Sequence, residues 1–127
     1  MPEKEKSGID HSWLEEDDEG QLAVDVFHTE DNLVLYAPIA GVKKEDLDIA
    51  INDEMVSIKG IRKPPSQPTD DQFYLQECYW GPFSRNYILP VAVLHDQAKA
   101  NLKDGLLTIT IPKDEKTKSK SVEISDE

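Results

Sequence analysis

The sequence predicts an all-β fold, an antiparallel immunoglobulin-like β-sandwich, and three features of the chain indicate it. Apolar residues alternate with polar ones at a period of two through most of residues 22–111, as in strands that bury one face. Turn-forming groups, among them Glu30-Asp31-Asn32 and Asp104-Gly105, separate these segments at short intervals. No segment carries a sustained helical stripe, which excludes the usual nucleotide-binding α/β folds.

Four strands are predicted in the first half of the domain. In the first of them Leu22, Val24 and Val26 share one face, and the other three alternate in the same way. A polar connection precedes the third strand, and the turn Asn52-Asp53-Glu54 joins the third and fourth strands as a hairpin. The four segments are residues 22–26, 33–37, 47–51 and 55–61.

A proline-rich loop separates the two halves of the domain. Residues 63–71 contain three prolines and no apolar period, so we expect a loop of limited flexibility. A loop of this length usually has a purpose. An aromatic-rich strand is predicted at residues 73–80 and another at residues 83–89, and residues 91–97 connect them to the last hairpin.

A tight hairpin closes the domain. Asp104-Gly105 supplies the two positive-φ positions that a two-residue turn requires. Alternating apolar residues follow the turn, and Pro112 ends the strand ladder because proline has no N–H to donate. The apolar positions of this last strand are Leu107, Ile109 and Ile111.

Length, charge and cysteine usage restrict the classes of function. A chain of 127 residues with 38% apolar residues supports one modest core. The net charge of -12 argues against nucleic acid as a partner, since phosphate binding needs clustered Lys and Arg. No long apolar run or secretory leader is found, and Cys78 has no second cysteine with which to pair. We therefore expect no membrane partner, a cytoplasmic location, and a small apolar packing role for Cys78.

Three regions are predicted along the chain. Residues 1–20 form a short acidic arm that we expect to be disordered, residues 21–112 form the domain, and residues 113–127 form a polar extension. Val122 and Ile124 interrupt that polarity. Two β-branched residues two positions apart point the same way from an extended chain, so they can enter adjacent pockets beside an open sheet edge. The alternative is a disordered tail with two aliphatic residues by chance.

Two motifs resemble those of one known family. The spacing Ala100-x-x-x-Asp104-Gly105-Leu106-Leu107 resembles the closing signature of the α-crystallin domain. Upstream, the stretch from Tyr79-Trp80-Gly81-Pro82-Phe83-Ser84-Arg85 to Leu89-Pro90 is similar to that family's aromatic-Gly-x-Phe-x-Arg strand, which ends in Leu-Pro. Together they identify a resemblance to the small heat shock proteins (Hsp20, or α-crystallin domain, family) of bacterial or archaeal type, over about residues 21–112 and the tail.

The resemblance implies a chaperone that binds unfolding proteins and prevents their aggregation without ATP. Such a holdase needs no cofactor, no metal and no catalytic residue. Its partners would be unfolding clients and other copies of the chain, first as a homodimer and then as a higher oligomer. The short acidic arm departs from the family, whose arms are commonly longer and more apolar.

The resemblance also assigns roles to particular residues. The segment after the long loop would cross to a partner subunit and pair with its early strand, and this segment comprises Phe73, Tyr74, Leu75, Gln76, Glu77 and Cys78. Val122-x-Ile124 would dock as a hook into a groove of a neighbouring dimer. The residues that would accept the hook are Leu47, Ile49, Ile51, Ala98, Ala100 and Leu102.

Arg85 is a further candidate site residue. A guanidinium between Phe83 and Tyr87 on a strand is either solvated or held by carboxylates through its planar fork. The resemblance places it at the dimer contact, with Asp25 or Glu77 as possible partners; the alternative is an exposed strand arginine. Trp80, beside a Gly-Pro bend, is expected to be a packing residue rather than a client contact.

Three other classes of protein were weighed. Catalysis is disfavoured because acidic pairs such as Asp70-Asp71 lie in exposed sequence and the histidines have no metal-ligand or triad spacing. A co-chaperone adaptor of the related CS/p23-like sandwich, which binds one folded partner, remains an alternative. An extracellular immunoglobulin-like adhesion module is disfavoured by the missing leader and cystine pair.

Overall fold

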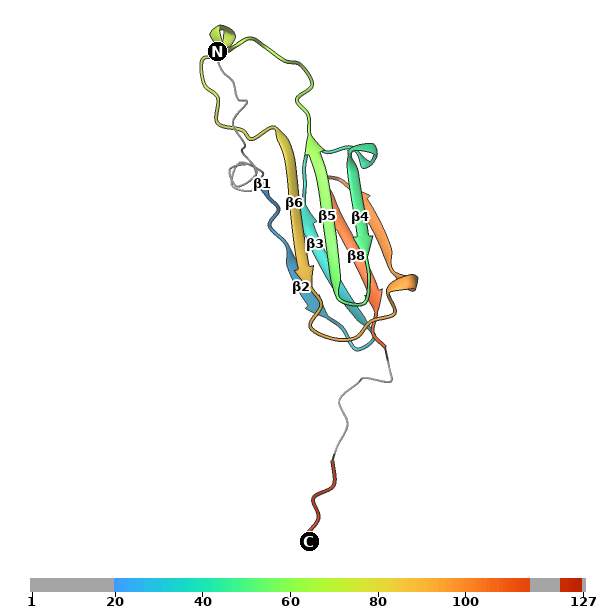
Figure 1. Ribbon diagram of the computed structural model, residues 1–127. Helices are drawn as coiled ribbons and strands as arrows, with labels where there is room; N and C mark the ends of the chain where they lie inside the picture. The colour runs from blue at the N-terminus through green and yellow to red at the C-terminus, as the bar shows by residue number, and fades with distance from the viewer. Residues whose placement is uncertain (1–19, 115–121, 127) are drawn as a thin grey trace, which may run out of the picture.

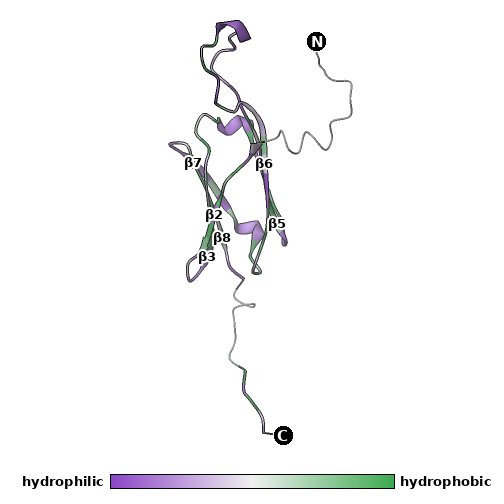
Figure 2. Ribbon diagram, turned by 90° about the vertical axis from the view of Figure 1, so that its left-hand side faces the viewer, coloured by the Kyte–Doolittle hydropathy of each residue, from purple (hydrophilic) through white to green (hydrophobic). Residues whose placement is uncertain are grey.

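The fold is a sandwich of two four-stranded sheets. The structure, a computed structural model, describes residues 20–114 and 122–126. The predicted acidic arm therefore lies outside the described residues, apart from Gly20. Figure 2 views the two sheets edge-on as two layers, and Figure 1 views them face-on with a long loop at one end. The predicted all-β fold class is confirmed.

Eight strands make up the two sheets. One sheet has the order β1-β6-β5-β4, and the other has the order β2-β3-β8-β7. The strands of the first sheet are β1 (Gly20–Gln21), β6 (Gly81–Ile88), β5 (Met55–Arg62) and β4 (Leu47–Ile51). Those of the second sheet are β2 (Asp25–His28), β3 (Asn32–Pro38), β8 (Leu106–Pro112) and β7 (Lys99–Lys103).

The prediction of one strand over residues 22–26 is wrong, because the chain crosses there from one sheet to the other: β1 ends at Gln21, residues 22–24 belong to no strand, and β2 begins at Asp25. β1 pairs with β6, whereas β2 pairs with β3 in the opposite sheet. Between them Leu22 is buried and its N–H donates to the carbonyl of Ser84 at 3.3 Å. The β1–β6 pair is parallel, unlike the other named pairs. A period-two pattern cannot reveal this crossing, because Leu22, Val24 and Val26 all pack in or against the same core.

Both predicted hairpin turns are confirmed. Asp104 has φ of 53° and Gly105 has φ of 78°, the left-handed conformations that a two-residue turn between β7 and β8 needs. The other turn depends on Asn52, whose Oδ1 accepts from the N–H of Glu54 at 2.8 Å and of Met55 at 2.9 Å. This side-chain cap explains why β4 can reverse directly into β5.

The aromatic-rich strand predicted at residues 73–80 is absent from the structure, so that prediction is wrong. Residues 63–80 form one long loop, interrupted by the 3-10 turn η2 (Asp70–Gln72). Two other short 3-10 turns are η1 (Lys44–Asp46) and η3 (His95–Gln97). A strand exists only where another edge takes its hydrogen bonds, and no strand of the described chain pairs with this loop.

The core lies between the two sheets and is aliphatic apart from one ring. Its largest fully buried side chains come from both layers, because β3 and β8 face β5 across the interior. Phe83 is the aromatic member, 3% exposed, and the guanidinium of Arg62 lies 5.7 Å from its ring centroid. The largest fully buried side chains are those of Ile39, Val56, Ile58, Leu107, Ile109 and Ile111.

Gly60 makes room for that ring, and this gives a first prediction. A Cβ on Gly60 would lie 2.4 Å from Cζ of Phe83 and 3.0 Å from the carbonyl oxygen of Asp46. We expect Gly60→Ala to lower the free energy of unfolding by about 1–3 kcal/mol, the usual cost of overpacking. Urea unfolding measures this change.

Lys59→Ala on the same strand serves as the control. Lys59 is exposed, so its replacement should change the free energy of unfolding by less than about 0.5 kcal/mol. Equal effects of the two substitutions would contradict the contact between Gly60 and Phe83.

Candidate interaction surfaces

The long loop presents apolar side chains to solvent. Tyr74 is 105% exposed and Leu75 is 73% exposed, while Phe73 is half-buried. Cys78 is an exposed free thiol, so its predicted role as an apolar filler is wrong for this chain by itself. Figure 1 shows the loop extending past the ends of β5 and β6. The segment predicted to cross to a partner therefore projects away from its own sandwich.

The second sheet has an edge that is open among the described residues. β2 pairs with β3 on one side and with no described strand on the other. Beside this edge Phe27 and Tyr36 meet edge-to-face, with ring centroids 5.1 Å apart, and each is somewhat more than one-third exposed. This aromatic pair was not among the predicted site residues. The signal was the alternation of β2 and β3, which assigns Phe27 and Tyr36 to the same outward face.

Arg85 joins the two sheets at the point where the chain crosses between them. It lies opposite Ile58 in the register and therefore faces the interior side of β6. Its Nη1 donates to the carbonyl oxygen of Leu22 at 2.9 Å, in a partly buried position. Within the described chain neither Asp25 nor Glu77 forms an ion pair with it. The main-chain acceptor is one that sequence reasoning did not consider.

Trp80 lies at the base of the loop. It is 39% exposed, and its Cζ3 lies 4.0 Å from the position of a Cβ built on Gly41. Arg62 reaches the same corner, where its Nε donates to the carbonyl oxygen of Ala40 at 3.0 Å. The ring therefore packs against this corner on one side while its other side stays open.

The six residues predicted to accept the hook lie along two neighbouring edges. β4 and β7 are edge strands of the two sheets, and Figure 1 shows them on the same side of the sandwich. Ala100 is exposed, whereas the other five are partly buried against the core. These five are Leu47, Ile49, Ile51, Ala98 and Leu102. The fold thus brings together two segments that are about fifty positions apart in sequence.

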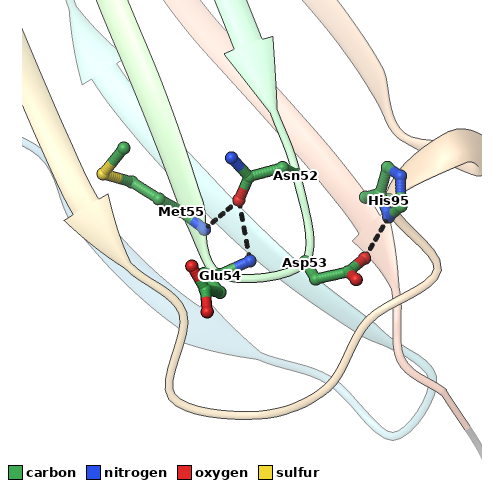
Figure 3. Close-up of polar contacts among 5 residues, drawn as sticks. All are labelled: Asn52, Asp53, Glu54, Met55 and His95. Carbon is green, nitrogen blue, oxygen red and sulfur yellow. Dashed lines mark hydrogen bonds and ion pairs between the residues drawn. The ribbon is translucent and has the colours of Figure 1, made fainter.

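A polar contact joins the two edges at one end (Figure 3). Nδ1 of His95 lies 2.7 Å from Oδ1 of Asp53. Asp53 belongs to the turn between β4 and β5, and His95 begins the η3 turn that leads into β7. The capping bonds of Asn52 hold the turn in the conformation that presents Asp53.

This contact is expected to contribute little to stability. The Asp53 side chain is 82% exposed and the His95 side chain is 41% exposed, so solvent screens their interaction. A double-mutant cycle with Asp53→Ala and His95→Ala should give a coupling energy below about 1 kcal/mol. Asn52→Ala, which removes the turn cap, should cost about 0.5–2 kcal/mol by analogy with side-chain caps of helices. A coupling larger than the loss of the cap would contradict this ranking.

The predicted hook is accessible. Val122 is 81% exposed and Ile124 is 93% exposed, and residues 122–126 have no regular secondary structure. β8, the last strand before the tail, ends at the end of the sandwich opposite the long loop (Figure 1). Both aliphatic side chains are therefore available to another molecule.

The side chains that could bind a metal ion are spread apart among the described residues. No group of three or more His, Cys, Asp or Glu that could hold a metal ion is found in the described ranges. Asp71 accepts from the hydroxyl of Thr69 at 2.5 Å, and Nζ of Lys113 lies 3.0 Å from Nδ1 of His28.

No described helix is long and apolar enough to cross a membrane.

Comparison with known proteins gives one consistent family. The profile of the Hsp20/alpha crystallin family matches residues 14–125. Small heat shock protein C4 of Rickettsia felis is 34% identical over 101 residues, which are 80% of this chain and 62% of that protein. The chain thus spans about three fifths of the length of that relative.

Two solved structures have the same fold. Heat shock protein 16.0 of Schizosaccharomyces pombe is 30% identical, with a TM-score of 0.71 over 84% of this chain and 100% of that one. A small heat-shock protein of Xylella fastidiosa, whose crystal structure reveals a distinct high order structure, is 30% identical, with a TM-score of 0.68 over 83% of this chain and 96% of that one.

Proposed function

The chain belongs to the Hsp20/alpha crystallin family, and from this premise we propose that it is an ATP-independent holdase. In this proposal it binds proteins that are unfolding and prevents their aggregation. Membership of a family of small heat shock proteins supports a chaperone role of this kind, and not an enzyme activity.

The observation that carries the proposal is the combination of open strand edges with exposed apolar side chains. Partly unfolded proteins expose apolar surface and unpaired backbone groups, and both make them aggregate. The described part of this chain offers β2, β4 and β7 as edge strands for the backbone groups. It also offers Leu75 and Ile88, each more than 70% exposed, for the apolar surface. Binding of this kind is broad and needs no bond to be broken.

Assembly is the second part of the proposal. The loop segment from Phe73 to Cys78 would add to the open edge of β2 in a partner subunit, where main-chain hydrogen bonds give affinity and alternate side chains give register. The exposure of Tyr74 and Leu75 supports this, because the exchange would bury them. Such an exchange is reciprocal and gives a two-fold dimer. Arg85, which supports the crossing into β2 through Leu22, would hold that edge in place.

Higher assembly would use the tail. Val122 and Ile124 of one dimer would enter the groove between β4 and β7 of another, where the edge of the core is only partly covered.

The exposed thiol of Cys78 suits a reducing compartment, and a cytoplasmic location is part of the proposal.

Heat-induced aggregation of a test client measures the activity. Citrate synthase is heated without nucleotide, alone and with the chain, while light scattering is recorded. We expect scattering to fall as the chain is added and to be nearly abolished near one subunit per client. Addition of ATP should leave the curves unchanged, because binding of this kind requires no bond to be broken.

Serum albumin at the same mass concentration controls for crowding and for non-specific adsorption. Protection equal to that of albumin would exclude the holdase. A chain that is monomeric and gives no protection, yet binds one folded partner, would point to the co-chaperone adaptor.

A further inference from the structure

The base of the long loop encloses an apolar hollow. Its volume is about 520 Å³, and it lies between the ends of β5 and β6 and the proline-rich part of the loop. Phe73 and Trp80 line it together with Ile61 and three prolines. The side chains that line this hollow leave it open, and Trp80 keeps 39% of its surface exposed beside it.

The electrostatics of the hollow differ from those of the rest of the chain. Arg62 and Lys63 line it, and none of its described lining residues is acidic, although the chain has 26 acidic residues and 14 basic ones. Arg62 is held at the corner by the carbonyl of Ala40. Nζ of Lys63 lies 3.1 Å from Asp46 and its side chain is still 61% exposed, so it remains accessible at the rim. An occupant that combines apolar groups with negative charge would fit.

The direction of β1 brings the preceding chain to this place. β1 runs parallel to β6, with Gly20 opposite Phe83. In a parallel pair earlier residues lie beside earlier residues, so β1 begins only two register positions along β6 from Gly81, which lines the hollow with Trp80. A Cβ on Gly20 would lie 2.9 Å from the ring of Tyr79. Figure 1 shows the start of β1 beside β6, on the side of the sandwich where the loop begins.

The sequence of that preceding segment matches the hollow. Residues 15–19 are Glu-Glu-Asp-Asp-Glu, and Trp13-Leu14 come directly before them. Trp13 is seven residues before Gly20, so it can reach at most about 25 Å from it. Apolar groups followed by negative charge are thus attached within reach of an apolar hollow with a basic rim.

We propose that residues 13–19 of the same chain occupy this hollow. Trp13 and Leu14 fill its apolar part, and the acidic run lies against Arg62 and Lys63. The segment would cover Phe73 until the loop exchanges with a partner. The contact concerns one chain by itself and does not depend on holdase activity.

Trp13 itself reports on the contact. Trp13 and Trp80 are the two tryptophans of the chain, so in the full chain with Trp80→Phe the fluorescence comes from Trp13 alone. We expect blue-shifted emission and several-fold weaker quenching by acrylamide than in a free peptide of residues 9–19. Lys63→Glu and high salt should both raise the quenching, because they weaken the ionic part of the contact.

Lys59→Glu makes the same charge change on β5 outside the hollow, and it should leave the quenching unchanged. Equal effects of the two charge reversals, or quenching equal to that of the peptide, would overturn the proposal. A signal lost on dilution would assign the arm to a neighbouring chain and would overturn the same-chain contact.

A second measurement leaves Trp80 in place. A nitroxide on Cys78, the single cysteine, should broaden the amide resonances of residues 13–19 in the full chain and spare those of residues 122–126. Cys78 lies between Gln76 and Trp80, which both line the hollow. Equal broadening of both segments, or none of either, would count against the arm in the hollow.

Discussion

Replacing Val122 and Ile124 together by serine is expected to reduce the assembled protein to dimers. Both side chains are more than 80% exposed in the single chain, so their burial in a groove would contribute about 1.5–3 kcal/mol each. Losing both should weaken each tail contact by about 10²- to 10⁴-fold. Light scattering of intact and altered chains at equal concentration measures the mass, and circular dichroism should show an unchanged sandwich.

Two further variants make this test specific to the hook and its groove. Glu123→Gln changes the residue between the two aliphatic side chains, which points the other way from an extended tail, and it should retain the full mass. Ala100→Gln should reproduce the loss from the groove side. Ala100 is exposed at the edge between the sheets, so a larger side chain can obstruct the groove without disturbing the core. Full-size assemblies from the doubly altered tail would contradict a role for the hook.

Removing the crossing segment is expected to have the second large effect, the loss of the dimer itself. In the variant considered, a short Gly-Ser turn replaces residues 65–77. Arg62 and Gly81 are already paired across β5 and β6, so a short connection can preserve both strands. The expected product is a folded monomer, whose mass lies below the 14.4 kDa of the intact chain because of the deletion. Light scattering measures the mass, and thermal unfolding checks that the cooperative transition remains.

A matched pair of point substitutions tests the same contact without shortening the chain. Leu75 is 73% exposed in the single chain. Leu75→Asp would place a carboxylate in the exchanged strand and should shift the equilibrium toward monomer, because burying an unpaired charge is costly. Leu75→Met keeps the volume and should leave the dimer intact. If the deletion variant remains dimeric, the subunits meet through a different surface.

The local elements of the fold follow from rules that act between neighbours in sequence. Asp104-Gly105 could be predicted as a hairpin turn because the turn needs positive φ at two successive residues, and few residue types adopt a positive φ. Asn52 caps its own turn through atoms only two and three residues away. The alternation in β3, β5 and β8 likewise separates buried from exposed faces, and those faces meet in the core.

The candidate surfaces were predictable only in part. The tail motif could be read directly, because Val122 and Ile124 stand alone in a polar segment. That β4 and β7 would lie on one side of the sandwich came from the family resemblance and not from residue patterns. The hollow at the base of the loop could not be predicted, because it depends on the path that residues 63–80 take beyond the ends of β5 and β6.

The sequence by itself therefore determined most of the strands, the tight turns, the apolar faces and the resemblance to a family. Only the tertiary structure decided which edges meet. It makes residues 22–24 a crossing between the two sheets, makes the β1–β6 pair parallel, and leaves residues 73–80 without a strand partner. It also gives Arg85 a main-chain acceptor 63 residues away. The physical reason is that turns and alternation depend on adjacent residues, whereas strand pairing depends on which open edge, in the same chain or in another, is free to accept the hydrogen bonds.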